Sequence, residues 1–235
     1  MKVIVIIPAA GLGTRMAPPS PGTGKSKQFA ELNGTPILIH TLRKFAASPA
    51  VAEIYIALRL DEMAEFRARL GKEALGKRVH LVEGGEHRQQ SVANALAAIS
   101  AIAEDIILIH DAVRPFVSED IIQQVIQAAQ KYGAAIAGMP AVDTVKQVDR
   151  TAEGAVITAT IPRERVVMAQ TPQGFRYGVL KKAFDEASAD GFMGTDEASL
   201  IERAGGDVAV VMGSPRNIKI TTPADMELAE FFLKG

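Results

Sequence analysis

The sequence predicts an α/β fold built on a doubly wound, mostly parallel sheet. Short runs of β-branched and aliphatic residues alternate with segments of helical periodicity, which is typical of consecutive βαβ units. The runs are almost entirely apolar, as strands covered by helices on both faces must be. A length of 235 residues also suffices for one large domain. The strands expected on these grounds are Val3–Ile7, Ile54–Leu58, Val79–Val82, Ile106–Ile109, Ala134–Met139 and Val208–Val211.

Four helices have recognisable starts. Thr35 followed by Pro36 predicts an N-cap and a proline in the first helical position. Ser118 and Thr195 are each expected to cap a helix whose first turn carries two acidic residues, at the positive end of the helix dipole. The segment Thr222–Asp225 combines a proline with a capping-box-like acid and predicts the last helix. We therefore expect a single Rossmann-like domain over residues 1–235.

Residues 141–161 interrupt this alternation and predict a β-hairpin arm. A turn at Thr151–Gly154 is flanked on both sides by apolar residues, as in a hairpin. A hairpin that extends from an α/β domain needs something to cover its apolar face. We expect a second subunit to do so, and hence a homodimer. The flanking apolar residues are Val142, Val145, Val148, Val156 and Ile157.

Composition excludes several classes of protein. The chain has 26 Lys+Arg against 27 Asp+Glu, so its net charge of -1 does not favour binding to nucleic acid or to a membrane surface. It has no Cys, which excludes disulfides, a thiolate nucleophile, iron–sulfur clusters and cysteine zinc sites. The first apolar stretch ends at Pro8 and is too short for a signal peptide. We expect a soluble, cytoplasmic protein.

A long Gly/Pro-rich loop follows the first strand, at residues 9–34. Gly11-Leu12-Gly13 does not continue into a dinucleotide-binding fingerprint, because Met16 stands where the third glycine is needed. Gly22–Ser26 is not a P-loop, because Pro19 replaces its first glycine and no strand precedes it. The loop could simply connect two elements. Its length and its several basic residues favour a functional role instead.

Two more clusters follow predicted strands, where open α/β sheets bind ligands. Gly84–Ser91 offers glycine backbone, an arginine and a serine, or is simply a turn before a helix. His110–Pro115 contains Asp111, a carboxylate placed to hold Mg²⁺ on phosphate oxygens. Alternatively, Asp111 caps a turn and pairs with Arg114.

The combined inventory is one of basic side chains, glycine backbone and one well-placed carboxylate. The sequence contains neither a G-x-S-x-G elbow nor the histidine spacing of a zinc site. This inventory suits phosphoryl or nucleotidyl transfer, where catalysis consists mostly of positioning and charge stabilisation. An attacking phosphate monoester is largely dianionic at neutral pH and needs no general base.

A series of ordered motifs resembles those of the 2-C-methyl-D-erythritol 4-phosphate cytidylyltransferases of the non-mevalonate isoprenoid pathway. The resemblance covers essentially the whole chain. It implies transfer of the cytidylyl group of CTP to 2-C-methyl-D-erythritol 4-phosphate, with release of pyrophosphate and Mg²⁺ as cofactor. The motifs are Ala9–Met16, Lys27-Gln28, His110–Pro115, Asp143–Lys146, Thr171–Gln173, Thr195–Ser199 and Asn217–Lys219.

The resemblance also implies which residues act on CTP. Arg15 and Lys27 would stabilise the pentavalent α-phosphate, with assistance from Lys219. Asp111 would hold Mg²⁺ on the triphosphate. The residues that would bind CTP itself are Ala9, Ala10, Gly11, Gly13, Gly85, Arg88 and Ser91, together with Asp111.

On the sugar-phosphate side, the resemblance implies contributions from two subunits. Arg114, Thr171 and Thr195 would shape this side of the site. The hairpin arm would cross to the partner, so that Thr144 and Arg163 contact the sugar phosphate bound by the neighbouring subunit.

The chain departs from the family pattern in two places. The loop between Arg15 and Lys27 is longer than usual, which makes Lys25 a rival for the catalytic lysine; the Gln28 and Phe29 that follow favour Lys27. Arg216 stands where some relatives carry an acid, so a second metal carboxylate there is not expected.

Two other functions stay open at this point. Ribitol-5-phosphate cytidylyltransferase shares the fold and the His110–Pro115 motif. A non-catalytic CTP-binding domain could use the same fold, although binding alone would not need cations aimed at the α-phosphate.

Overall fold

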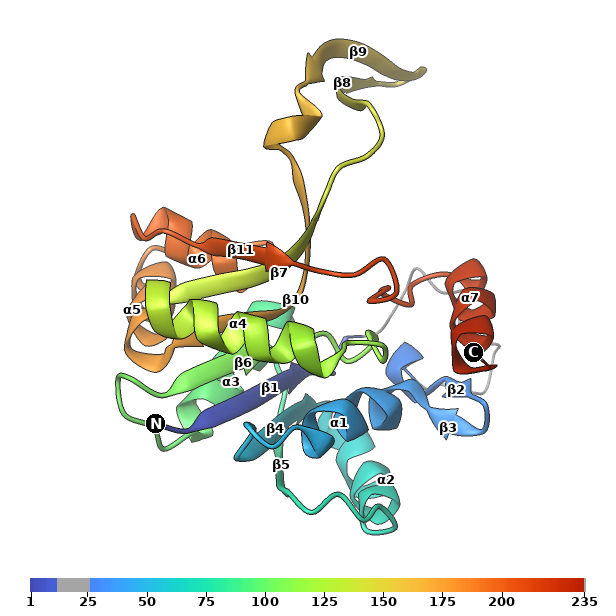
Figure 1. Ribbon diagram of the computed structural model, residues 1–235, viewed down its shortest axis with the longest axis vertical. Helices are drawn as coiled ribbons and strands as arrows, with labels where there is room; N and C mark the ends of the chain where they lie inside the picture. The colour runs from blue at the N-terminus through green and yellow to red at the C-terminus, as the bar shows by residue number, and fades with distance from the viewer. Residues whose placement is uncertain (12–25, 235) are drawn as a thin grey trace.

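The computed structural model describes residues 1–11 and 26–234 and contains a seven-stranded sheet at its centre. The strand order is β11-β7-β10-β6-β1-β4-β5 (Figure 1). Every predicted strand is present, which confirms the α/β class. The strands are β1 (Val3–Pro8), β4 (Glu53–Leu58), β5 (Arg78–Glu83), β6 (Ile106–Ile109), β7 (Ala134–Pro140), β10 (Val167–Arg176) and β11 (Ala209–Met212).

One strand of this sheet runs against the others. β10 pairs antiparallel with both β6 and β7, whereas the remaining pairs are parallel. β10 is not among the strands predicted from the sequence. The edge strands β5 and β11 are also less buried than expected, and on β11 Val210 is 51% and Met212 61% exposed.

Helices cover both faces of the sheet, and the side chains of β1 alternate between them. Val5 and Ile7 pack on one face in a core that includes α1, α2 and α4, whereas Ile4 and Ile6 pack on the other with α3, α5 and α6. The doubly wound arrangement is thus confirmed. The helices are α1 (Ile37–Ala47), α2 (Leu60–Leu70), α3 (Arg88–Ala98), α4 (Glu119–Tyr132), α5 (Tyr177–Ala189), α6 (Glu197–Arg203) and α7 (Pro223–Lys234).

Two predicted helix starts are confirmed and two are displaced by one residue. The Ser118 hydroxyl accepts a hydrogen bond from the N–H of Ile121, and α7 begins at Pro223 as expected. α1 begins only after Pro36, because the backbone of Thr35 pairs instead in the short ribbon of β2 (Glu31–Leu32) and β3 (Thr35–Pro36). α6 is capped by Asp196 rather than Thr195, since the Asp196 carboxylate accepts from the N–H of Ser199 at 3.0 Å.

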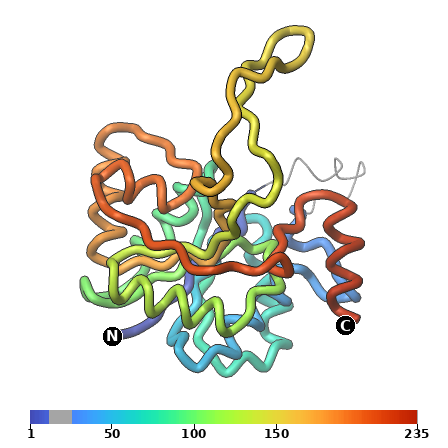
Figure 2. The backbone as a smooth tube through the Cα atoms, turned by 45° about the horizontal axis from the view of Figure 1, so that its top comes forward, coloured from blue at the N-terminus to red at the C-terminus, as the bar shows by residue number. Residues whose placement is uncertain are grey.

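The predicted hairpin is present as β8 (Val145–Thr151) and β9 (Gly154–Ile161), which form a two-stranded sheet separate from the central one. It projects from the ends of β7 and β10, well away from the rest of the chain (Figures 1 and 2). Its apolar side chains face solvent: Val156 and Ile157 are each 60% exposed. Within the part of the chain that the structure describes, no helix is long and apolar enough to cross a bilayer.

Candidate active site

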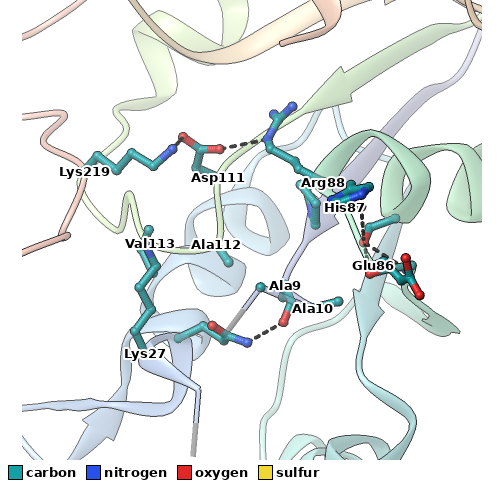
Figure 3. Close-up of a pocket in the computed structure, with 15 residues that line it drawn as sticks. Ala9, Ala10, Lys27, Glu86, His87, Arg88, Asp111, Ala112, Val113 and Lys219 are labelled. Carbon is teal, nitrogen blue, oxygen red and sulfur yellow. Dashed lines mark hydrogen bonds and ion pairs between the residues drawn. The ribbon is translucent and has the colours of Figure 1, made fainter. Parts of the chain in front are cut away.

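A cavity of about 240 Å³ lies where β1, β5 and β6 end at the same edge of the sheet (Figure 3). The segment after β1 forms one wall, and the turn between β5 and α3 forms another. The segment after β6 closes the cavity, and side chains reach it from the short 3-10 helix η1 (Lys27–Phe29) and from the segment before α7. Its lining residues include Ala9, Ala10, Gly11, Lys27, Gln28, Gly85, Glu86, His87, Arg88, Ser91, Asp111, Ala112, Val113 and Lys219.

Most of the residues predicted to act on CTP therefore meet in one place. Lys27 and Lys219 are 192 positions apart in the sequence (219 minus 27), yet both line this cavity. Gly13, Arg15 and Lys25 lie outside the described residues.

The walls of the cavity are held by close packing and by backbone hydrogen bonds. A Cβ on Gly84 would lie 2.4 Å from the Cβ of Ala10, so glycine is needed where these two segments touch. The N–H of Gly85 donates to the Ser91 hydroxyl at 3.0 Å, and that hydroxyl donates to the carbonyl of His87 at 3.1 Å. The Gln28 amide donates to the carbonyl of Ala9. Ser91 thus braces the loop that forms one wall of the cavity.

Asp111 is the electrostatic centre of the site. Its carboxylate contacts the Lys219 Nζ at 2.9 Å, the Arg114 Nε at 3.3 Å and the Arg88 Nε at 3.4 Å. Figure 3 shows Lys219 and Arg88 approaching Asp111 from opposite sides. Burial alone would raise the pKa of Asp111, but these three positive charges outweigh it and hold the pKa well below its usual value. Asp111 is therefore ionised at every pH at which the protein would work.

Glu197 fixes the side chain of Arg88, a role that was not predicted from the sequence. The Arg88 Nη1 donates to both carboxylate oxygens of Glu197, at 2.6 and 2.8 Å, and Glu197 is 1% exposed. Burial would lower the pKa of Arg88, but Glu197 and Asp111 raise it above its ordinary value. For the carboxyl group of Glu197 burial has the opposite effect and raises the pKa, and the charge of Arg88 limits that rise. The only signal in the sequence is the second acid of Thr195–Ser199, which also suits the positive end of a helix dipole.

Arg114 and Thr171 lie just behind the cavity, in contact with Asp111 and its neighbours. Arg114 pairs with Asp111 and donates from Nη1 to the carbonyl of Asn217 at 2.8 Å. The Thr171 hydroxyl accepts from the N–H of Asp111 at 3.0 Å. The pairing of Asp111 with Arg114 that the sequence offered as an alternative is therefore present, within a larger cluster of cations.

The remaining predicted residues are not brought to this cavity by the chain itself. Thr144 belongs to the projecting arm, and Arg163 lies just after it, where it donates to the carbonyl of Val142 at 2.8 Å. Thr195 precedes α6 and is not among the lining residues.

A metal ion at this site would depend on the substrate for most of its ligands. Among residues 1–11 and 26–234, no group of three or more His, Asp or Glu side chains could hold a metal ion. Asp111 supplies one carboxylate, which already accepts from three cationic groups. Mg²⁺ is commonly bound by one or two carboxylates together with substrate phosphates and water, so the donor set fits an ion delivered with a triphosphate.

Comparisons with known proteins agree over the whole chain. Residues 3–235 match the profile of a family described as 2-C-methyl-D-erythritol 4-phosphate cytidylyltransferase. A protein of that name from Acidobacterium capsulatum is 58% identical, covering 100% of this chain and 98% of that protein. Another from Solibacter usitatus is 55% identical, covering 100% and 96%.

Solved structures show the same agreement. The Francisella tularensis 2-C-methyl-D-erythritol 4-phosphate cytidylyltransferase superimposes with a TM-score of 0.82 at 36% identity, covering 98% of this chain and 99% of that one. The 4-diphosphocytidyl-2C-methyl-D-erythritol synthase from Anaerococcus prevotii gives a TM-score of 0.83 at 30% identity, covering 100% and 99%.

Proposed function

Because this chain belongs to the 2-C-methyl-D-erythritol 4-phosphate cytidylyltransferase family, we infer that it transfers the cytidylyl group of CTP to 2-C-methyl-D-erythritol 4-phosphate. A phosphate oxygen of the sugar phosphate attacks the α-phosphorus of CTP, and the bond from that phosphorus to the β-phosphate oxygen breaks. The products are 4-diphosphocytidyl-2-C-methyl-D-erythritol and pyrophosphate. The observation that carries this inference is the full-length family match, joined to a cavity lined by Lys27, Arg88 and Lys219.

In this proposal, cations around the cavity overcome the repulsion between two anionic phosphates. Lys27 and Lys219 stabilise the charge that develops on the α-phosphate, together with Arg15 from the first loop. The backbone after β1 cradles the triphosphate, and Gly85, Arg88 and Ser91 surround the cytidine. No general base is needed, because the attacking phosphate is mostly dianionic near pH 7.

Mg²⁺ is proposed as the cofactor, with Asp111 as its protein ligand. The ion would neutralise charge on the triphosphate and orient it. Because Asp111 is held among Arg88, Arg114 and Lys219, it would share its carboxylate between these cations and the metal. The proposal predicts that chelation of divalent cations abolishes turnover.

The sugar phosphate is proposed to bind between two subunits of a homodimer. Arg114, Thr171 and Thr195 would come from one subunit, and Thr144 and Arg163 from the arm of its partner. The exposed apolar side chains of β8 and β9 support this, because a hairpin with 60% of Val156 and Ile157 in solvent lacks a core of its own. We also propose that each chain forms one nucleotidyltransferase domain and acts in the cytoplasm, where CTP is available.

The arm-exchange proposal can be tested with Val156→Asp. A carboxylate buried against a partner arm is costly, so the variant should shift the protein from dimer to monomer in light scattering and lose activity with it. Glu153→Asp at the tip of the arm is the matched control. If the wild-type protein is monomeric and fully active, the arm does not contribute to the active site.

The activity itself is tested by pyrophosphate release with Mg²⁺ and CTP. Turnover with 2-C-methyl-D-erythritol 4-phosphate, and not with ribitol 5-phosphate, is the expected result. Preference for ribitol 5-phosphate would keep the mechanism and change the substrate. Binding of CTP without turnover on either substrate would identify a non-catalytic domain.

The choice of catalytic lysine is tested in the same assay. Arg15→Ala and Lys27→Ala should each lower the rate by at least ~10²-fold, because each removes a charge where the transition state gains one. Lys25→Ala should have a much smaller effect. Equal loss in the Lys25 and Lys27 variants would mean that the loop is assigned incorrectly.

A further inference from the structure

His110 is a fully buried polar side chain for which the reaction has no direct use. It follows β6 directly, is 0% exposed, and meets the ring of Phe45 edge-on with 4.7 Å between ring centroids. Each ring nitrogen faces an uncharged group, the Arg114 carbonyl or the Thr171 hydroxyl, so the buried imidazole is favoured in its neutral form. It is not among the lining residues of the cavity, yet its ring is hydrogen-bonded to the Arg114 carbonyl and, through Thr171, to Asp111.

The hydrogen bonds around His110 determine its tautomer. Nε2 lies 3.0 Å from the carbonyl oxygen of Arg114, and a carbonyl oxygen can only accept, so Nε2 carries the proton. Nδ1 of the neutral ring is then an acceptor, and it lies 3.1 Å from the Thr171 hydroxyl, which must donate to it. The same hydroxyl oxygen accepts from the N–H of Asp111 at 3.0 Å.

These three bonds connect the two ends of the turn from Asp111 to Arg114. One end is held through the Arg114 carbonyl, and the other through Thr171 and the Asp111 N–H. The turn is also closed by a bond from the Arg114 N–H to the Asp111 carbonyl at 3.1 Å. Because Asp111 in turn holds Lys219 at 2.9 Å, the orientation of this turn determines where the Lys219 ammonium lies.

We propose that His110, as its neutral Nε2–H tautomer, is a positioning residue that acts through Thr171 to fix the Asp111–Arg114 turn and, with it, Lys219. The placement of Lys219 at the α-phosphate rests on the proposed function; the hydrogen-bond relay does not. A displacement of about 1 Å in a group that acts on the transition state can cost up to ~10²-fold in rate. His110 therefore affects kcat more than the binding of the sugar phosphate.

The relay also restricts what Thr171 can do. Its hydroxyl proton is directed to His110, so while the relay is intact the hydroxyl can only accept. A phosphate oxygen near neutral pH also mainly accepts hydrogen bonds. The Thr171 hydroxyl can therefore contact the sugar phosphate only by accepting from one of its hydroxyl groups, while it orients Asp111.

The kinetic test compares Thr171→Val, Thr171→Ser and His110→Gln. Thr171→Val removes the hydroxyl and should lower kcat about 10-fold to ~10²-fold, with a smaller change in KM for 2-C-methyl-D-erythritol 4-phosphate. Thr171→Ser restores the hydroxyl and should recover most of that loss. In His110→Gln the relay is already broken, so adding Thr171→Val should cost little more. Raised KM with unchanged kcat in Thr171→Val, or losses that multiply in the double variant, would overturn the proposal.

A second measurement reads the relay without any turnover. A long-range ¹H–¹⁵N spectrum of ¹⁵N-histidine-labelled protein distinguishes the two tautomers of each of the four histidines. His110, identified by the signals that shift in Thr171→Val, should show a protonated Nε2 and an unprotonated Nδ1 at pH 7. A protonated Nδ1 would overturn the relay whatever the enzyme does. The expected spectrum with no turnover would instead uphold the relay and count against the proposed function. This measurement also serves if His110→Gln fails to fold.

Discussion

The buried pair of Glu197 and Arg88 gives the sharpest prediction for stability, through the substitution Glu197→Gln. The two side chains meet at 2.6 and 2.8 Å, with Glu197 1% and Arg88 30% exposed. At about 2.7 Å and an effective dielectric constant of about 20, their Coulomb attraction is about 6 kcal/mol. Removing one partner of a fully buried pair costs about 3–5 kcal/mol. Arg88 keeps some water and its contact with Asp111, so we expect the free energy of unfolding to fall by about 2–3 kcal/mol.

Urea unfolding followed by circular dichroism measures this loss, since the chain has no Trp to report by fluorescence. The urea midpoint should fall at an unchanged m value. The KM for CTP should rise as well, because Arg88 lines the cavity and loses the group that orients it. Glu202→Gln, at an exposed position of the same helix, is the matched control. Equal stability of the two variants would refute the energetic role given to the pair.

Two further substitutions test the packing and the pH dependence derived above. Gly84→Ala places a Cβ 2.4 Å from that of Ala10, so it should lower the free energy of unfolding by about 1–3 kcal/mol and weaken CTP binding. Calorimetry of CTP binding checks this, and an unchanged affinity would contradict it. Asp105 has a lowered pKa: burial would raise it, but the N–H groups of Lys2 and Ile102 donate to its carboxylate and outweigh burial. A pKa that is lower in the folded than in the unfolded state stabilises the folded protein at pH values above the unfolded-state pKa of about 3.9. This stabilisation is lost as the pH falls through the folded-state pKa. Asp105→Asn should therefore cost about 2 kcal/mol at pH 7 and progressively less below about pH 4, and a loss independent of pH would argue against the charge.

The sequence could predict the layers of the fold because the pattern of apolar residues within each segment indicates how that segment is buried. A run such as Ile106–Ile109 is apolar throughout, as a central strand must be. The hairpin was equally visible, since a turn at Thr151–Gly154 separates two apolar segments. The sequence also predicted that the cationic residues and Asp111 would cluster, because each comes from a segment at or near the carboxyl end of a strand. These residues are Lys27, Arg88, Asp111 and Lys219.

Other features depend on partners that are distant in the sequence. β10 contains the run Gln170–Gly174, which has low strand propensity and includes a register shift in the pairing with β7. Gln173 and Gly174 lie in the strand because each pairs with both β6 and β7. Glu197 looked like an ordinary helix-start acid, and only the fold shows that Arg88, 109 residues earlier, lies beside it. The misplaced caps at Thr35 and Thr195 have a more local cause. The backbone of Thr35 pairs with Leu32 in the β2–β3 ribbon, and the side chain of Asp196 takes the capping position next to Thr195.

The way in which the arm joins the sheet has a consequence for how this protein can vary. Pro140 at the end of β7 and Val167 at the start of β10 are direct partners in the sheet, and the N–H of Ala141 donates to the carbonyl of Val166 at 3.0 Å. The chain thus leaves and re-enters the domain at adjacent points, so the register of the seven strands does not depend on the length of the segment between them. The entropy of closing a loop grows only slowly with its length, by about 0.6 kcal/mol for each doubling. The arm is therefore an exchangeable insertion: residues can be added or removed near Thr151–Gly154 while the nucleotide-binding half of the molecule keeps its structure.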